Sequence, residues 1–178
     1  MVQALDPYLL KFSKQLGYVN LHHTPSESLK ILNDIQIPIS KNFKMIMVIR
    51  NPYARIISIY NYAKEGLVPR NIQSFDCFLD MLDARNKKDP EALKLLKSKL
   101  YDTQLNWTLD PNAFNIHIFK YEVLDPIEIA DCLGIPTLTL TRENTNTIPS
   151  EQYELESYQK EKIYSMYEEE FNLYSYRK

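Results

Sequence analysis

The sequence predicts an α/β protein built on a parallel sheet. Two short apolar runs have the length and composition of strands, residues 45–49 (MIMVI) and residues 115–119 (NIHIF). The first run is continuously apolar, which is typical of a strand covered on both faces, as in parallel sheets. Segments with helical spacing of apolar residues lie before, between and after the two runs, and strands that alternate with helices favour parallel pairing.

Proline, serine and glycine mark where the expected helices begin and end. Pro52 suits the first position of a helix, where its missing N–H costs nothing, and the apolar residues after it follow the i, i+3, i+4, i+7 rule. Ser26 and Ser74 are candidate N-caps, and Gly134 is a candidate stop. We expect helices over residues 7–16, 26–33, 74–83, 126–133 and 154–178, and from Pro52 towards Gly66.

The composition indicates a single globular domain over residues 1–178. Hydrophobic residues make up 44% of the chain and charged residues 25%, which is ordinary for a soluble protein. The formal net charge of −2 creates no overall basic field that would attract nucleic acid or an anionic membrane surface. A local site must therefore hold any anionic ligand.

Several features predict a cytoplasmic protein. No apolar stretch approaches the roughly 20 residues of a membrane span, and Asp6 and Pro7 interrupt the N-terminal segment, unlike a secretory signal. Cys77 and Cys132 lack the spacing of a metal or redox motif, which predicts free, buried thiols. A single disulfide between them is the alternative. No cluster of residues suggests a metal site.

Glycine is scarce, with three residues in the whole chain. Loops that cradle phosphate through their backbone N–H groups usually need several glycines. Neither GxxxxGK[ST] nor GxGxxG occurs in the sequence. A self-contained nucleotide loop of either standard type is therefore excluded within this chain.

The residues after the first strand have the chemistry of an anion site. Ligands of parallel sheets bind at the carboxyl ends of strands, where Arg50 lies. A guanidinium suits bidentate contact with phosphate, and the helix that Pro52 opens adds unpaired N–H groups and a positive dipole end. Ser58 lies two turns into this helix and could reach the same phosphate. Equally open at this point is a purely structural ion pair of Arg50 with an acidic neighbour.

Residues 48–60 (VIRNPYARIISIY) resemble the 3′-phosphate-binding motif of sulfotransferases, particularly the Golgi-type carbohydrate sulfotransferases and their bacterial and viral relatives. The resemblance implies a P-loop-NTPase-like parallel sheet flanked by helices. It also implies that Arg50 and Ser58 bind the 3′-phosphate of 3′-phosphoadenosine 5′-phosphosulfate (PAPS). Arg55, in the same motif, is expected to support the fold by pairing with an acidic group.

Weaker matches follow in the family's order. Residues 119–124 (FKYEVL), residues 133–136 (LGIP) and the closing segment 163–177 resemble family segments, as does the Thr103-Gln104 step. The resemblance implies transfer of a sulfuryl group from PAPS to a hydroxyl acceptor, with carbohydrate as the expected acceptor class. It also implies 3′-phosphoadenosine 5′-phosphate (PAP) as product and no metal.

Histidines and a late polar turn complete the expected site. The resemblance to the 2-O-sulfotransferase branch implies that His23, or else His22, is the base that takes the proton of the acceptor hydroxyl. The alternative is that one of them packs against or caps the following helix. We expect His117, inside the second strand, to be structural. Asn146 and Thr147 align with the family's late cofactor loop, and an ordinary polar turn is the alternative.

One family segment has no counterpart before His22. Sulfotransferases of this type carry a loop of the form PKxGxTS that clasps the 5′-phosphosulfate, and its lysine stabilises the leaving oxygen. The sequence leaves three explanations: an N-terminally incomplete product, a diverged loop, or a fold kept without full catalysis. The alternative function is therefore a catalytically inactive sulfotransferase-like domain that binds a nucleotide or a protein partner.

Overall fold

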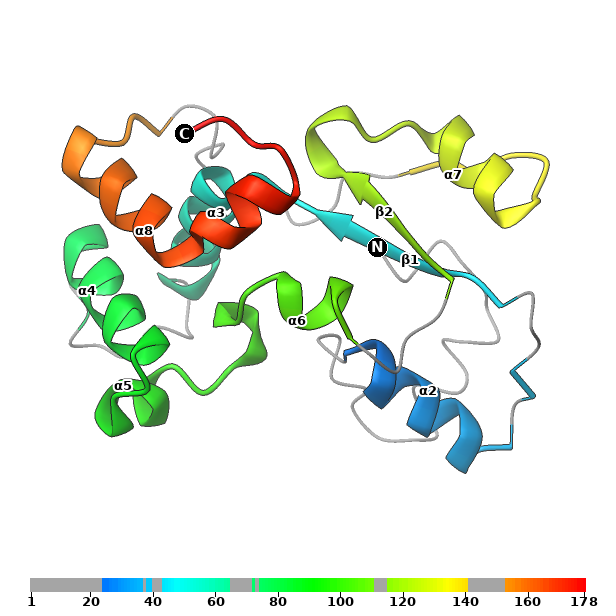
Figure 1. Cartoon of the computed structure of the whole chain (residues 1–178), viewed down its shortest axis with the longest axis horizontal. Helices are drawn as coiled ribbons and strands as arrows, with labels where there is room; N and C mark the ends of the chain where they lie inside the picture. The colour runs from blue at the N-terminus through cyan, green and yellow to red at the C-terminus, as the bar shows by residue number, and fades with distance from the viewer. Residues whose placement is uncertain are drawn as a thin grey trace. The chain divides into compact units, whose positions relative to one another are not determined.

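The computed structural model describes residues 24–36, 38–39, 43–64, 72, 74–110, 115–140 and 153–178. Along these residues the elements are α2 (Pro25–Asp34), β1 (Met45–Ile49), α3 (Pro52–Lys64), α4 (Phe75–Asn86), α5 (Pro90–Leu95), the 3₁₀ helix η2 (Lys99–Tyr101), α6 (Leu105–Thr108), β2 (Ile116–Lys120), the 3₁₀ helix η3 (Tyr121–Val123), α7 (Pro126–Leu133) and α8 (Ser157–Leu173) (Figure 1). The helix expected over residues 7–16 lies outside the described residues.

Both predicted strands are confirmed, and β1 and β2 pair in a small parallel sheet (Figure 1). The mixture of strands and helices agrees with the predicted α/β class. Burial of β1 is smaller than predicted, because Ile49 alone of its five residues is buried and the others are half-buried. The continuous apolar run therefore identified the strand correctly but overstated how fully its side chains are covered.

Local capping chemistry sets most helix ends as predicted. Pro52 opens α3, and the side chain of Ser74 accepts a hydrogen bond from the Cys77 N–H at 3.1 Å at the start of α4. Gly134 ends α7 with φ of 71°, a left-handed conformation that costs glycine little. These three ends are confirmed.

The predicted cap of the first described helix is wrong. Thr24, and not Ser26, is the N-cap of α2: its side chain accepts from the Glu27 N–H, and the Glu27 carboxylate accepts from the Thr24 N–H at 2.8 Å. This reciprocal capping box satisfies two helix-end donors at once, and Pro25 fits the first helical position. Ser26 instead donates its hydroxyl to Asp110 at 2.5 Å.

The chain divides into two compact units. The described residues of the first unit belong to Met1–Val48, Trp107–Phe119 and Val123–Thr145, and those of the second unit belong to Ile49–Asn106, Lys120–Glu122 and Asn146–Lys178. The first unit holds α2, α7 and most of the two strands. The second unit holds α3, α4, α5 and α8, and it is the unit that carries Arg50.

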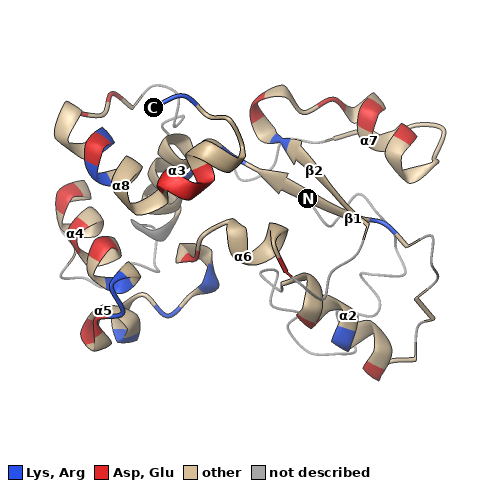
Figure 2. Ribbon diagram, in the orientation of Figure 1, with Lys and Arg blue, Asp and Glu red and all other residues tan. Residues whose placement is uncertain are grey.

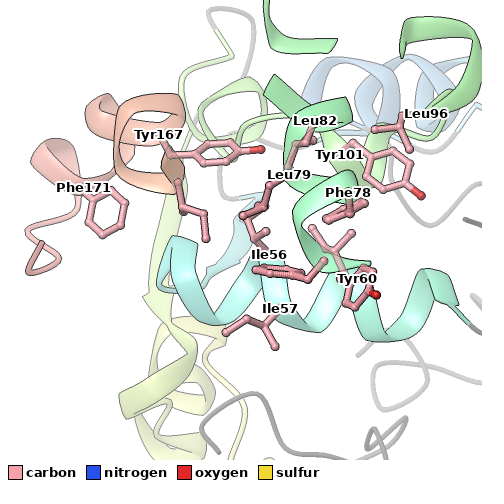
Figure 3. Packing of buried hydrophobic residues seen from close by; sticks show 13 residues of the cluster. Ile56, Ile57, Tyr60, Phe78, Leu79, Leu82, Leu96, Tyr101, Tyr167 and Phe171 are labelled. Atoms are coloured by element: carbon pink, nitrogen blue, oxygen red, sulfur yellow. The ribbon is translucent and has the colours of Figure 1, made fainter. Parts of the chain in front are cut away.

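A hydrophobic core fills the second unit where α3, α4 and α8 pack together (Figure 3). Ile56 from α3, Phe78 from α4 and Ile163 from α8 are completely buried. Aromatic rings make up much of the core: the rings of Tyr60 and Phe78 are 5.4 Å apart, within the usual range for aromatic pairs. This core fixes the helix whose first turn follows Arg50.

Charged residues of both signs are scattered along the described elements (Figure 2). Near the end of α8, three consecutive glutamates, Glu168 to Glu170, are followed by Phe171. Glu168 and Glu169 are exposed, whereas Glu170 is completely buried. A charge at 0% exposure requires partners within the protein.

Two further expectations concern the surface. Cys77 and Cys132 are free, as predicted, but Cys77 is exposed and Cys132 is half-buried, so the expectation of buried thiols is wrong. Cys77 lies in the first turn of α4, on the side that faces water. Among the helices of the described residues, none is both long and apolar enough to cross a membrane.

Candidate functional site

The turn from Arg50 to Pro52 is the centre of the candidate site. Asn51 caps α3, since its Oδ1 accepts a hydrogen bond from the Tyr53 N–H at 2.9 Å. The Asn51 carbonyl then accepts the first helical hydrogen bond, from the Arg55 N–H at 2.8 Å. Pro52 is buried at the first helical position. This sequence therefore places Arg50 directly before the positive end of the α3 dipole.

The side chain of Gln104 fixes the main chain of Arg50 from both sides. Gln104 Oε1 accepts a hydrogen bond from the Arg50 N–H at 2.7 Å, and Gln104 Nε2 donates to the Arg50 carbonyl at 2.9 Å. Gln104 is buried, so water competes little for either bond. The side-chain amide of Gln104 therefore bonds the N–H and the carbonyl of Arg50, as the main chain of a neighbouring strand would.

The guanidinium of Arg50 stacks on the ring of Tyr121, with 4.7 Å between its central carbon and the ring centroid. Such a cation–π contact stabilises the charge by about 0.5–1 kcal/mol at exposed sites and more where water is excluded. A guanidinium carries its N–H donors in a planar fork, and this geometry matches two oxygens of an anion.

Glu122 brings a negative charge to the same turn. Its Oε1 accepts a hydrogen bond from the Asn51 N–H at 2.6 Å, and its Oε2 accepts from the Tyr176 hydroxyl at 3.1 Å. Burial raises the pKa of Tyr176 well above its usual range, and the nearby negative charge of Glu122 raises this pKa further. Tyr176 therefore keeps its proton at neutral pH and remains a donor to Glu122.

These contacts correct one expectation about the helix end. The sequence suggested that the first N–H groups of α3 are unpaired, but Asn51 and Tyr53 both donate within the protein. A phosphate at this turn would depend on the Arg50 guanidinium, the helix dipole and the Ser58 hydroxyl more than on those two N–H groups. Ser58 is half-buried in α3, about 9 Å along the helix axis from Pro52.

Arg55 is a structural residue, as predicted. Its guanidinium lies 3.5 Å from Glu170 Oε1, donates to the Asp102 carbonyl at 2.9 Å and stacks over the ring of Tyr167 at 4.9 Å. Its side chain is 11% exposed. These contacts join α3 to α8 within the core of the second unit.

A cavity of about 460 Å³ opens beside the first turns of α3. Asn51, Tyr53 and Ala54 line one side of it, and Tyr153 and Lys160 line another. Ala54 shares a helix face with Ser58, one turn further on. The volume lies in the range of ligand pockets.

The remaining predicted residues divide into two groups. His117 lies in β2 with a ring nitrogen 3.2 Å from Asn115 Oδ1, a local contact that agrees with a structural role. His22, His23, Asn146 and Thr147 lie outside the described residues. Across the parts of the chain that the structure describes, no group of three or more potential ligands is arranged to hold a metal ion.

Sequence reasoning did not assign Gln104, Glu122 and Glu170 to the site. A signal for Glu170 exists, because α8 repeats its apolar face at Ile163, Tyr167, Phe171 and Tyr174, and position 170 falls on this face. A charge on an apolar face indicates a buried partner. The identity of that partner follows only from the fold.

Comparison with known families places this strand–helix site in context. A sequence model described as the sulfotransferase family matches residues 11–177, nearly the whole chain. The chain therefore belongs to the sulfotransferase family. No curated protein matches the chain, and no solved structure matches it.

Proposed function

We propose that this chain is a PAPS-dependent sulfotransferase that transfers a sulfuryl group to a hydroxyl acceptor, with carbohydrate as the acceptor class. The observation that carries the proposal is Arg50, with its main chain held by Gln104 and its guanidinium stacked on Tyr121 at the start of α3. Membership of the sulfotransferase family supports it. PAPS, when bound, supplies an activated sulfuryl group and leaves as PAP.

The turn is suited to an anion. The Glu122 carboxylate already accepts a hydrogen bond from the Asn51 N–H at 2.6 Å, so the start of α3 stabilises one negative group of the protein itself. In the proposal, Arg50 neutralises the 3′-phosphate through its N–H fork, and the Ser58 hydroxyl donates to the same phosphate. Both residues hold the ligand without taking part in a bond change.

The cavity beside α3 is proposed to receive the adenosine part. Tyr53 and Tyr153 offer aromatic surface to a base, and Lys160 adds a positive charge to the lining. Asn146 and Thr147 are proposed to contact the same nucleotide, on the sequence resemblance alone. His23, with His22 as the alternative, is proposed to take the proton from the attacking hydroxyl on the same ground.

Substitution of Arg50 by alanine tests the nucleotide site. Arg50→Ala removes the contact between the guanidinium and the phosphate, and a hydrogen bond to a charged group contributes about 1.5–3 kcal/mol. We expect PAP to bind about 10- to 150-fold more weakly to the variant than to the wild type. Isothermal titration calorimetry measures this ratio directly.

Arg177→Ala is the matched control, because Arg177 is an exposed arginine of the same unit. PAP affinity should stay at the wild-type value in this variant, which separates a specific contact from a loss of net charge. The proposal fails if the wild type does not bind PAP, or if Arg50→Ala binds it as tightly as the wild type does.

Substitution of His23 tests the chemical step separately from binding. His23→Ala should leave PAP affinity unchanged and lower sulfate transfer about 10²- to 10⁴-fold, the usual contribution of a positioned general base. Transfer of labelled sulfate from PAPS to a panel of glycans measures the rate. Full activity in His23→Ala and loss of activity in His22→Ala would move the role to His22, and full activity in both would place the base elsewhere.

A catalytically inactive nucleotide-binding domain is the second candidate function. The observation that favours it is the sequence, in which no counterpart of the lysine-bearing PKxGxTS loop for the 5′-phosphosulfate is recognisable. The two candidates differ in one measurement. PAP binding with no transfer to any acceptor of the panel supports the inactive domain, and transfer with turnover excludes it.

A further inference from the structure

Gln104 connects the anion-site arginine to the core of the second unit. It lies between η2 and α6, where its side-chain amide makes both hydrogen bonds to the main chain of Arg50. Arg50 follows the last residue of β1, so the amide continues the hydrogen-bond pattern of a strand by one residue. A side chain that pairs with both main-chain groups restricts φ and ψ of Arg50.

A single buried carboxylate holds Gln104 in turn. Glu170 Oε2 accepts from Gln104 Nε2 at 2.7 Å, and Glu170 Oε1 accepts from the Gln104 main-chain N–H at 2.6 Å. Thr103 donates its hydroxyl to the same Oε1 at 2.5 Å. Both the main chain and the side chain of Gln104 are therefore tied to one residue of α8.

This arrangement determines which way the amide points. The Glu170 carboxylate offers acceptors to Gln104, so the NH₂ group of the amide must face it. The carbonyl oxygen of the amide is then directed to the N–H of Arg50, and the second N–H of the amide reaches the Arg50 carbonyl. A flipped amide would face oxygen with oxygen at Glu170 and hydrogen with hydrogen at Arg50.

Arg55 balances the charge that this arrangement buries. Its guanidinium is 3.5 Å from Glu170 Oε1, and Tyr167 and the Asp102 carbonyl hold it there. The carboxylate is completely buried. Desolvation of such a group is costly unless it is paired and hydrogen-bonded. Here the carboxylate oxygens accept three hydrogen bonds from Thr103 and Gln104, besides the contact with Arg55.

We propose that Gln104 and Glu170 are positioning residues, which fix the main chain of Arg50 so that its guanidinium meets the 3′-phosphate in a single geometry. The inference rests on the proposed function, because it assigns these residues to the nucleotide site defined there. Gln104 acts directly on Arg50, and Glu170 acts through Gln104. Neither residue needs to touch the nucleotide.

The magnitude follows from the freedom that the amide removes. Release of one residue's backbone from a single conformation corresponds to a factor of about 5 to 30 in an equilibrium constant. In a variant without the amide, ligand binding through Arg50 would have to restrict the Arg50 backbone again, and this cost would weaken binding. The loss should appear only for ligands that Arg50 contacts.

Two nucleotides isolate that contact. PAP and adenosine 5′-phosphate share the base, the ribose and the 5′-phosphate, and PAP alone has the 3′-phosphate. The ratio of their affinities therefore reports on the 3′-phosphate contact. In Gln104→Met, which keeps the length of the side chain and removes the amide, we expect calorimetry to give a ratio about 5- to 30-fold smaller than in the wild type, with adenosine 5′-phosphate bound as before.

Two more variants make the test specific. Gln104→Asn keeps the amide on a side chain one methylene shorter, which cannot reach both main-chain groups of Arg50, so the ratio of affinities should fall in this variant too. It provides the test if Gln104→Met does not fold. Leu82→Ala removes a completely buried core side chain of α4 and serves as a control for lost stability alone. Its ratio should equal that of the wild type.

The outcomes separate the two proposals. A wild type that binds both nucleotides equally overturns the proposed function, and this inference falls with it. A wild type that prefers PAP, together with Gln104 variants that keep the same ratio, overturns the inference alone. Equal weakening of both nucleotides in the Gln104 variants also overturns it, because that result indicates a purely structural residue.

Discussion

Replacement of Glu170 by alanine is expected to lower the free energy of unfolding by about 3–5 kcal/mol. The substitution leaves the Arg55 guanidinium, with its side chain 11% exposed, without its buried counter-charge. It also removes the acceptor of the Thr103 hydroxyl and of two N–H groups of Gln104. Each buried donor that loses its acceptor adds a desolvation penalty of about 1–3 kcal/mol, although the penalties overlap.

Urea denaturation followed by circular dichroism measures this change. Glu169→Ala is the matched control, since Glu169 precedes Glu170 in the same helix and is exposed. Its effect should stay within about 0.5 kcal/mol. Equal stabilities of the two variants would show that the buried carboxylate does not hold the core together.

Replacement of Phe78 by alanine is expected to be comparably damaging, at about 3–5 kcal/mol. Phe78 is completely buried on α4, and its ring lies 5.4 Å from that of Tyr60 and 6.1 Å from that of Tyr101 (Figure 3). Alanine would leave a cavity among rings that cannot collapse into it without a shift of whole helices. The cost therefore exceeds that of the lost apolar surface alone.

A graded series checks the mechanism as well as the size. Phe78→Leu fills more of the cavity and should cost less than Phe78→Ala, and Tyr62→Ala should cost little because Tyr62 on α3 is 49% exposed. Urea midpoints of the three variants give the order. If Phe78→Ala and Phe78→Leu are equally stable, packing against the neighbouring rings is not the source of the effect.

Local chemistry explains the parts of the fold that the sequence predicted well. Pro52, Ser74 and Gly134 each set a helix end through their own backbone or side chain, so their neighbours in sequence suffice to predict them. The first cap was wrong because two candidates compete within three residues. Thr24 forms a reciprocal pair with Glu27, whereas Ser26 is engaged by Asp110, which no local rule could predict.

The candidate site shows the same division. Arg50 was predictable because the end of a strand, a proline and a helix lie together in the sequence. Gln104 and Glu170 were not predictable, because their partners are distant in sequence. Gln104 lies 54 residues from Arg50, and Glu170 lies 66 residues from Gln104. A glutamate on the apolar face of α8 indicates that a buried partner exists, and only the packing of α8 against α3 identifies it.

The contact between Arg55 and Glu170 also has a consequence for biosynthesis. The two residues are 115 positions apart, which a ribosome adding roughly 5–20 residues per second covers in about 6–23 s. During that interval the nascent chain contains the Arg-Asn-Pro turn but not the carboxylate that anchors Gln104. We therefore expect α3 to reach its final environment only after the last turns of α8 have been made.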